Sequence, residues 1–168
     1  MNQSTDGFQA IDNKRTITWK DPMQVAQDCK EMNGLQYWQA VQLGKISPNP
    51  INTLIGISVV EVDRGRIVLA IRPEEYHYGS LGTVQNGLAA TLLDTAIGYA
   101  VHTTLSVGYK YTLLDINVRY MRPFTRETSI IYCEGIVIHV SGHVVNAGAK
   151  IFQGFSKVMG GEKDESIH

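Results

Sequence analysis

A single carboxylate, Asp94, stands in the middle of the most apolar helical stretch of the chain. Leucine, isoleucine and alanine recur around it at the spacing of a wide helical face, which predicts a helix over roughly residues 87–101. A charge in such surroundings is unfavourable unless it is paired or functional. Spacing alone leaves two interpretations: Asp94 takes part in chemistry, or it hydrogen-bonds a neighbouring loop.

The loop before this helix brings a glycine, Gly87, to the helix N-terminus. Unpaired backbone N–H groups and the helix dipole at such a position favour an anion or a developing oxyanion. A carboxylate combined with oxyanion donors is the outline of acyl transfer. The sequence therefore indicates acyl-transfer chemistry built on Gly87 and Asp94.

One helix cannot bring both groups to one substrate. Gly87 and Asp94 are seven residues apart, about 10 Å along a helix, whereas a reacting carbonyl needs its donor and its base within ~3 Å. Either Asp94 acts with another group, or a second copy of the chain supplies its Asp94 to this copy's Gly87. A stripe of small and polar residues on the helix favours the second arrangement, a two-fold dimer with shared sites. The stripe comprises Gly87, Thr91, Asp94, Thr95, Gly98 and His102.

The elements that position this helix follow from the changing period of the apolar residues. Two short helices are predicted over about residues 22–32 and 34–43, after which Pro48 and Pro50 turn the chain. A β-hairpin is predicted over residues 55–72, and further strands over residues 112–122, 128–140 and 143–153. We expect an α+β fold in which an antiparallel sheet of about five to six strands wraps around one long apolar helix.

Length and composition narrow the class of protein. The 168 residues fit one domain. We expect a flexible segment over residues 1–18, N-terminal helices over 19–45, the main domain over 46–160 and a flexible C-terminus over 161–168. A net charge of −1 gives no overall attraction to nucleic acid or to an anionic membrane. Two distant cysteines and no secretory signal or membrane-length apolar run are typical of a cytoplasmic protein.

Three stretches of the chain resemble a known family. Residues 81–87 (LGTVQNG), 90–96 (ATLLDTA) and 114–123 (LDINVRYMRP) look like the hotdog-fold thioesterases of the phenylacetate-degradation (PaaI-like) branch. The resemblance covers roughly residues 33–160 and is specific in its second half. It implies hydrolysis of acyl-CoA thioesters in dimers that often pair into tetramers, without a metal or a prosthetic group. The helix acid of the family corresponds to Asp94 and its oxyanion glycine to Gly87.

The chain departs from the family pattern at several polar positions. Gln85-Asn86-Gly87 stands where the family usually has His-Gly-Gly, and Gly79 where it usually has asparagine. Leu113 occupies a position that often carries serine or threonine. The Gln85 amide can still donate a hydrogen bond to a thioester carbonyl, as in a related thioesterase branch. The lost asparagine and hydroxyl help to hold the attacking water in the family, which makes weak activity or a changed mechanism an alternative.

Further site residues follow from the same resemblance. Basic residues near one end of the sheet, of which Arg122 and His143 are favoured, are candidates to receive the phosphates of CoA, and Asn86 and Thr91 are candidate substrate contacts. The five histidines show no metal-ligand spacing, so we expect no metal and no cofactor beyond the CoA of the substrate.

Three functions remain open. The first is an acyl-CoA thioesterase with Asp94 as general base or nucleophile. The second is a catalytically weak acyl-CoA-binding protein of the same fold, which the residues at 79, 85 and 113 favour. The third is a structural dimerisation module. A hydratase is less favoured because Gln85 stands where a histidine would be needed.

Overall fold

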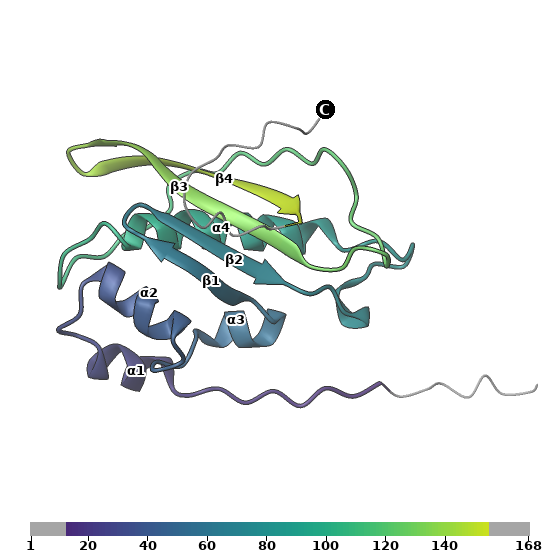
Figure 1. Ribbon diagram of the computed structural model, residues 1–168, viewed down its shortest axis with the longest axis horizontal. Coiled ribbons are helices and arrows are strands. Elements are labelled where there is room, and N and C mark those ends of the chain that lie inside the picture. The colour runs from purple at the N-terminus through teal and green to yellow at the C-terminus, as the bar shows by residue number, and fades with distance from the viewer. Residues whose placement is uncertain (1–12, 155–168) are drawn as a thin grey trace, which may run out of the picture.

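The protein is represented by a computed structural model, in which residues 13–154 are described. Figure 1 shows the antiparallel sheet with a long helix behind it and the short N-terminal helices on one side. The helices are α1 (Pro22–Asp28), α2 (Gly34–Gln42), α3 (Pro50–Ile55) and α4 (Asn86–His102), with a short 3₁₀ turn, η1 (Glu75–His77). The strands are β1 (Ser58–Asp63), β2 (Arg66–Ile71), β3 (Ile131–Ser141) and β4 (Val144–Gln153), in the spatial order β1-β2-β3-β4.

The N-terminal helices begin at side-chain caps. The Asp21 carboxylate accepts a hydrogen bond from the N–H of Met23 at 2.8 Å, and Asn33 forms a reciprocal capping box with Gln36. Both predicted short helices are therefore confirmed, although α1 ends at Asp28. Helix α3 was not predicted. Its first residue is Pro50, a position where a helix needs no N–H, so this proline starts a helix instead of only ending one.

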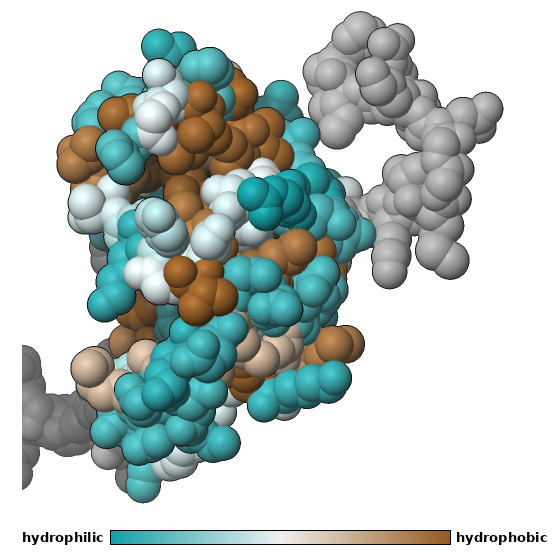
Figure 2. Space-filling model, turned by 90° about the vertical axis from the view of Figure 1, so that its left-hand side faces the viewer, coloured by the Kyte–Doolittle hydropathy of each residue, from teal (hydrophilic) through white to brown (hydrophobic). Residues whose placement is uncertain are grey.

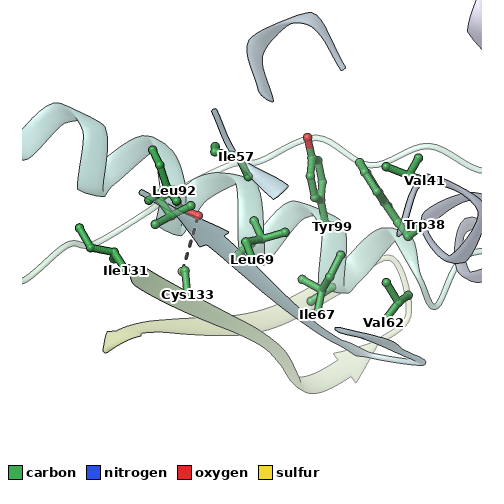
Figure 3. Packing of buried hydrophobic residues seen from close by; sticks show 13 residues of the cluster. Trp38, Val41, Ile57, Val62, Ile67, Leu69, Leu92, Tyr99, Ile131 and Cys133 are labelled. Atoms are coloured by element: carbon green, nitrogen blue, oxygen red, sulfur yellow. Dashed lines mark hydrogen bonds between the residues drawn. The ribbon is translucent and has the colours of Figure 1, made fainter. Parts of the chain in front are cut away.

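The core lies between the apolar face of α4 and the sheet. Figure 3 shows Leu92 and Tyr99 of α4 facing Leu69 on β2 and Cys133 on β3. Trp38 of α2 closes the core at one end, where its ring stacks on Tyr99 with centroids 3.6 Å apart. Burial of these side chains supplies the main driving force that holds α4 against the strands.

Helix α4 approaches β3 at a glycine. A Cβ added to Gly135 would lie 2.2 Å from the carbonyl oxygen of Ala96, closer than any real contact. The strand can therefore carry no side chain there while the helix keeps its place. This close approach fixes the depth of α4, and with it the depth of Asp94 and Gly87.

The expected number of strands was too high. Among the described residues the sheet has four strands, and residues 112–122, predicted as a strand, form no strand and pair with none of the four. A groove of about 1290 Å³ separates this segment from β4 and is floored by Leu93 and Ile97 of α4. The alternating pattern predicts an extended backbone, but it does not say which edge the backbone joins, and within one chain it joins none.

The ends of the chain are only partly described. The expected flexible segments fall partly (residues 1–18) or wholly (residues 161–168) outside residues 13–154. Within the described range α2 packs on β1, so the N-terminal helices and the sheet share one body. None of the helices described here is long and apolar enough to cross a membrane.

Candidate active site

The N-terminus of α4 presents free backbone donors. Gln85 is the residue before the helix and makes no side-chain cap hydrogen bond. Gly87 is exposed, and a Cβ added there would meet no atom within 4 Å. Within residues 13–154 its N–H has no hydrogen-bond acceptor. The donor proposed for an oxyanion is thus accessible and unoccupied by protein groups.

Asp94 lies two turns further along the same helix and is exposed in the single chain. No residue of the described chain forms a hydrogen bond or an ion pair with its carboxylate. The alternative that Asp94 merely bonds a neighbouring loop is therefore not supported. The carboxylate is available to a substrate, to water or to a second chain.

Thr91 lies between these two residues and is engaged by the helix itself. Its hydroxyl donates a hydrogen bond of 2.9 Å to the carbonyl oxygen of Gly87. This contact occupies the hydroxyl proton, so Thr91 can offer a substrate only an acceptor lone pair. Asn86, by contrast, is exposed at the first position of α4.

Gln85 and Gly79 lie next to one another. The loop between them is tightened by hydrogen bonds from the N–H of Gly79 to the carbonyl of Thr83 and from the N–H of Gly82 back to Gly79. A Cβ at Gly79 would sit 3.1 Å from the Oε1 atom of Gln85. The Gln85 side chain therefore occupies space that a larger residue at position 79 would need. The glycine at 79 and the glutamine at 85, which both depart from the family pattern, are thus sterically coupled.

His77 is a residue of this region that sequence reasoning missed. Its buried ring accepts a hydrogen bond from the N–H of Glu74 at Nδ1 (2.9 Å), and Nε2 lies 2.9 Å from the carbonyl oxygen of Ile55. The first contact requires an unprotonated Nδ1, so the neutral ring donates through Nε2–H. Burial lowers the pKa of His77. In the sequence, the only sign that His77 holds this turn is its position three residues after Glu74, the residue that caps the turn.

Tyr111 is a second missed residue. Its ring lies directly on the backbone of α4, with the hydroxyl oxygen 2.6 Å from the position that a Cβ would take at Gly98. Burial raises the pKa of Tyr111 to about 12, and the negative charge of Asp94 adds to the effect. The contact joins residues from different elements through a glycine, which no local pattern in the sequence reveals.

The remaining candidates do not converge in one chain. Leu113 is 43% exposed and lines the groove beside β4 together with Arg122. The carbonyl of Phe124 accepts from the N–H of Val84, which places Arg122 near the loop that leads into α4. His143 lies in the turn between β3 and β4, at the opposite end of these strands, so the structure does not bring it to Arg122.

Two other basic residues are already engaged. Lys150 forms an ion pair of 3.0 Å with Glu134, and the Arg126 guanidinium lies 5.6 Å from the centre of the Tyr78 ring. As for metals, residues 13–154 contain no group of three or more His, Cys, Asp or Glu side chains arranged to hold one.

Part of the chain is similar in sequence to known proteins. The family model described as "Thioesterase superfamily" matches residues 81–158. A protein of Halobacterium salinarum named as an esterase is 38% identical over 76 residues, which are 42% of this chain and 50% of that protein. Human acyl-coenzyme A thioesterase 13 is 28% identical over 92 residues, which are 55% of this chain and 59% of that protein. The chain therefore spans little more than half the length of the curated relatives it matches.

Solved structures extend the likeness over more of the chain. A thioesterase of Ralstonia eutropha, described as a phenylacetic acid degradation-related protein, superposes with a TM-score of 0.63 at 19% identity. The match covers 70% of this chain and 89% of that one. The sequence match from residue 81 relates that part of the chain to the thioesterase superfamily, and the helix on one antiparallel sheet together with these structural neighbours shows that the chain has the hotdog fold.

Proposed function

We propose that the protein hydrolyses acyl-CoA thioesters to a free acid and CoA. The observation that carries this proposal is the free Gly87 N–H and the unpaired Asp94 carboxylate on one helix. Support comes from the thioesterase family match over residues 81–158, which contains both residues, and from relatives named as an esterase and as an acyl-coenzyme A thioesterase. A cytoplasmic location is part of the same proposal.

The chemistry assigns one role to each group. As a general base, Asp94 takes a proton from water while the water oxygen bonds to the thioester carbonyl carbon. The resulting oxyanion accepts hydrogen bonds from the Gly87 N–H and the Gln85 amide. The C–S bond then breaks, and the proton held by Asp94 passes to the departing thiolate. If Asp94 acts instead as nucleophile, its oxygen attacks the same carbon and the C–S bond breaks, and water then hydrolyses the anhydride and gives a proton to the departed thiolate.

The site is proposed to combine two chains. Gly87 and Asp94 lie about 10 Å apart along the axis of α4, so the carbonyl bound at one Gly87 reaches the Asp94 of a second copy. We propose a homodimer that pairs into a dimer of dimers. Exposed apolar residues near the β3–β4 turn, Ile138, Val140 and Val144, offer a surface for such contacts. Figure 2 shows apolar surface in its upper part, at the height of the β3–β4 hairpin in Figure 1.

Arg122 is proposed to contact the CoA phosphates, because it lies near the loop that leads to Gly87. His143 lies at the other end of β3 and β4, so it enters the proposal only as a group of another subunit.

The test is a panel of acyl-CoA substrates with CoA thiol release as the readout. Short, long and aromatic acyl groups are compared at equal concentration, with S-acyl-cysteamine esters as the matched panel without the nucleotide. Turnover of at least one acyl-CoA above the uncatalysed rate supports the proposal. Tight binding of CoA esters without turnover would favour the second candidate, an acyl-CoA-binding protein. The departures from the family pattern at residues 79, 85 and 113 support this candidate. Neither binding nor turnover would leave a structural dimerisation module.

A further inference from the structure

Tyr111 occupies a notch in the helix that carries Asp94. Its hydroxyl oxygen and two ring carbons lie 2.6, 2.9 and 3.0 Å from the place where a Cβ would stand on Gly98. Only glycine leaves room for the ring in this position. Gly98 follows Asp94 by one helical turn and belongs to the same stripe of small and polar residues. The ring of Tyr111 thus lies against the helix one turn beyond Asp94, whose carboxylate the proposed reaction uses.

The Tyr111 hydroxyl is a free donor. Within residues 13–154 it forms no hydrogen bond, although the ring lies against Gly98 and its centre is 5.9 Å from that of the His102 ring at the end of the same helix. The raised pKa of about 12 keeps the phenol protonated at neutral pH. Tyr111 therefore offers an O–H throughout the pH range in which a carboxylate base works, and it does not itself act as an acid or a base.

The spacing between the two groups fits a bridging molecule. Cβ positions one helical turn apart are ~5–6 Å from each other, so the Tyr111 hydroxyl beside Gly98 and the Asp94 side chain belong to the same stretch of helix surface, where one water can contact both. The charge of Asp94 acts on the Tyr111 phenol, yet no direct hydrogen bond joins them. A water held by both groups would satisfy the free donor and the free acceptor together.

We propose that Tyr111 is a further active-site residue, whose hydroxyl donates a hydrogen bond to the water that Asp94 activates. This inference rests on the proposed function. It also accounts for Leu113, which carries no hydroxyl and faces the groove: the donor comes instead from a residue two positions earlier. In the reaction the water gives one proton to Asp94 and its oxygen to the carbonyl carbon, while Tyr111 keeps its proton and orients the water lone pair.

The first experiment compares Tyr111→Phe with Tyr109→Phe, an exposed tyrosine of the same loop. Tyr111→Phe keeps the ring on Gly98 and removes only the hydroxyl. We expect kcat for the best acyl-CoA to fall ~10- to 100-fold, the effect of one hydrogen bond to a charged site, with KM little changed. The acid limb of the kcat–pH profile should move to higher pH, because a carboxylate that loses a donor through its water ionises less readily. Tyr109→Phe should match the wild type in kcat, in KM and in the kcat–pH profile.

A second experiment tests the notch itself by a double-mutant cycle between Gly98→Ala and Tyr111→Ala. The added methyl requires the Tyr111 ring to move away from Gly98, so Gly98→Ala alone should lower both kcat and the melting temperature. In the Tyr111→Ala background the same change should raise the melting temperature, because alanine is favoured over glycine within a helix, and should leave kcat unaltered. Additive effects on the melting temperature would overturn the placement of Tyr111.

The outcomes separate this inference from the proposed function. If Asp94→Asn abolishes hydrolysis but Tyr111→Phe retains the wild-type kcat and pH profile, the role of Tyr111 is wrong and the proposed function stands. If no variant and no wild-type protein hydrolyses any thioester, both reaction roles are wrong. In that case ¹³C-tyrosine NMR still tests the pairing, since Asp94→Asn should lower the pKa of the Tyr111 phenol.

Discussion

The backbone N–H of Gln85 donates a hydrogen bond of 3.0 Å to the carbonyl oxygen of His77. The buried His77 ring is in turn held by the N–H of Glu74 and the carbonyl of Ile55. Gln85, the residue before α4 that is proposed to polarise the substrate carbonyl, is thus positioned by a neutral histidine from the preceding turn. Two predictions follow directly from this pair, one on stability and one on turnover.

The first prediction concerns pH. Burial lowers the pKa of His77 below the ordinary 6.5, with Arg15 also lowering it and the Ile55 carbonyl and Glu74 opposing. Unfolded chains therefore bind a proton near pH 6.5 that the folded protein resists, so the free energy of unfolding should fall as pH drops from about 6.5 towards the lowered value. Denaturant midpoints at pH 7.5, 6.5 and 5.5 measure this. His77→Asn, which can still accept from Glu74, should show a shallower pH dependence, whereas equal slopes would contradict the assignment.

The second prediction concerns Gln85. If its amide polarises the thioester carbonyl, Gln85→Ala should lower kcat by ~10- to 10³-fold, the range for removal of one oxyanion donor. Gln85→His should then bring no large gain. If the wild type is only a binder, Gln85→His combined with Gly79→Asn should instead raise turnover. Hydrolysis and binding measured on the wild type and these three variants distinguish the two cases, because the expected changes have opposite signs.

The third prediction is that Asp94→Asn abolishes hydrolysis and leaves the fold intact. The amide keeps the shape of the side chain but is a poor base and a poor nucleophile, so kcat should fall ~10²-fold or more. Asp94 is exposed and unpaired in the single chain, so the melting temperature should not change. Full activity in this variant would remove Asp94 from the reaction.

The fourth prediction tests whether two chains share each site. Asp94→Asn and Gly87→Phe chains should each form inactive homodimers, whereas their heterodimer should recover one working site of its two. The Gly87 position is open within the chain, so the large side chain should block the site without unfolding the protein. Activity that stays absent in verified heterodimers would mean that each subunit builds its own site.

The fifth prediction uses two glycines of opposite surroundings. Gly135→Ala places a methyl 2.2 Å from the Ala96 carbonyl, so α4 must move and unfolding should become easier by roughly 1–3 kcal/mol. Gly87→Ala adds a methyl in open space and should leave the melting temperature unchanged or slightly higher. Thermal melts of both variants check the close approach of α4 to β3; equal stability would refute it.

Local patterns predicted the elements that depend on neighbouring residues. The apolar stripe of α4, the β1–β2 hairpin and the last two strands follow from period and turn residues, and all appear in the structure. Residues 112–122 show that such patterns do not predict which strand a segment pairs with. Their alternation indicates an extended backbone, but pairing depends on an edge that is distant in sequence or belongs to another chain.

The residues of the candidate site also fall into those that local sequence patterns reveal and those that only tertiary contacts reveal. Asp94 and Gly87 were found because an isolated charge and a helix-start glycine are visible in sequence. Tyr111 and His77 were not, because each acts through a contact set by tertiary structure: a notch at Gly98 in one case and a backbone carbonyl in the other. His143 was grouped with Arg122 because the resemblance implies the CoA nucleotide near one end of the sheet, and strand register separates the two residues.

Cys133, fully buried between β3 and α4 with its Sγ atom 3.6 Å from the Leu92 carbonyl, has a practical consequence for assays of this protein. Burial raises the pKa of its thiol to about 12, so it should not react with a disulfide dye while the protein is folded. Cys29, the other cysteine of the chain, is partly exposed. A dye that detects released CoA should therefore register at most one protein thiol per chain, and the appearance of a second would report the separation of α4 from the sheet.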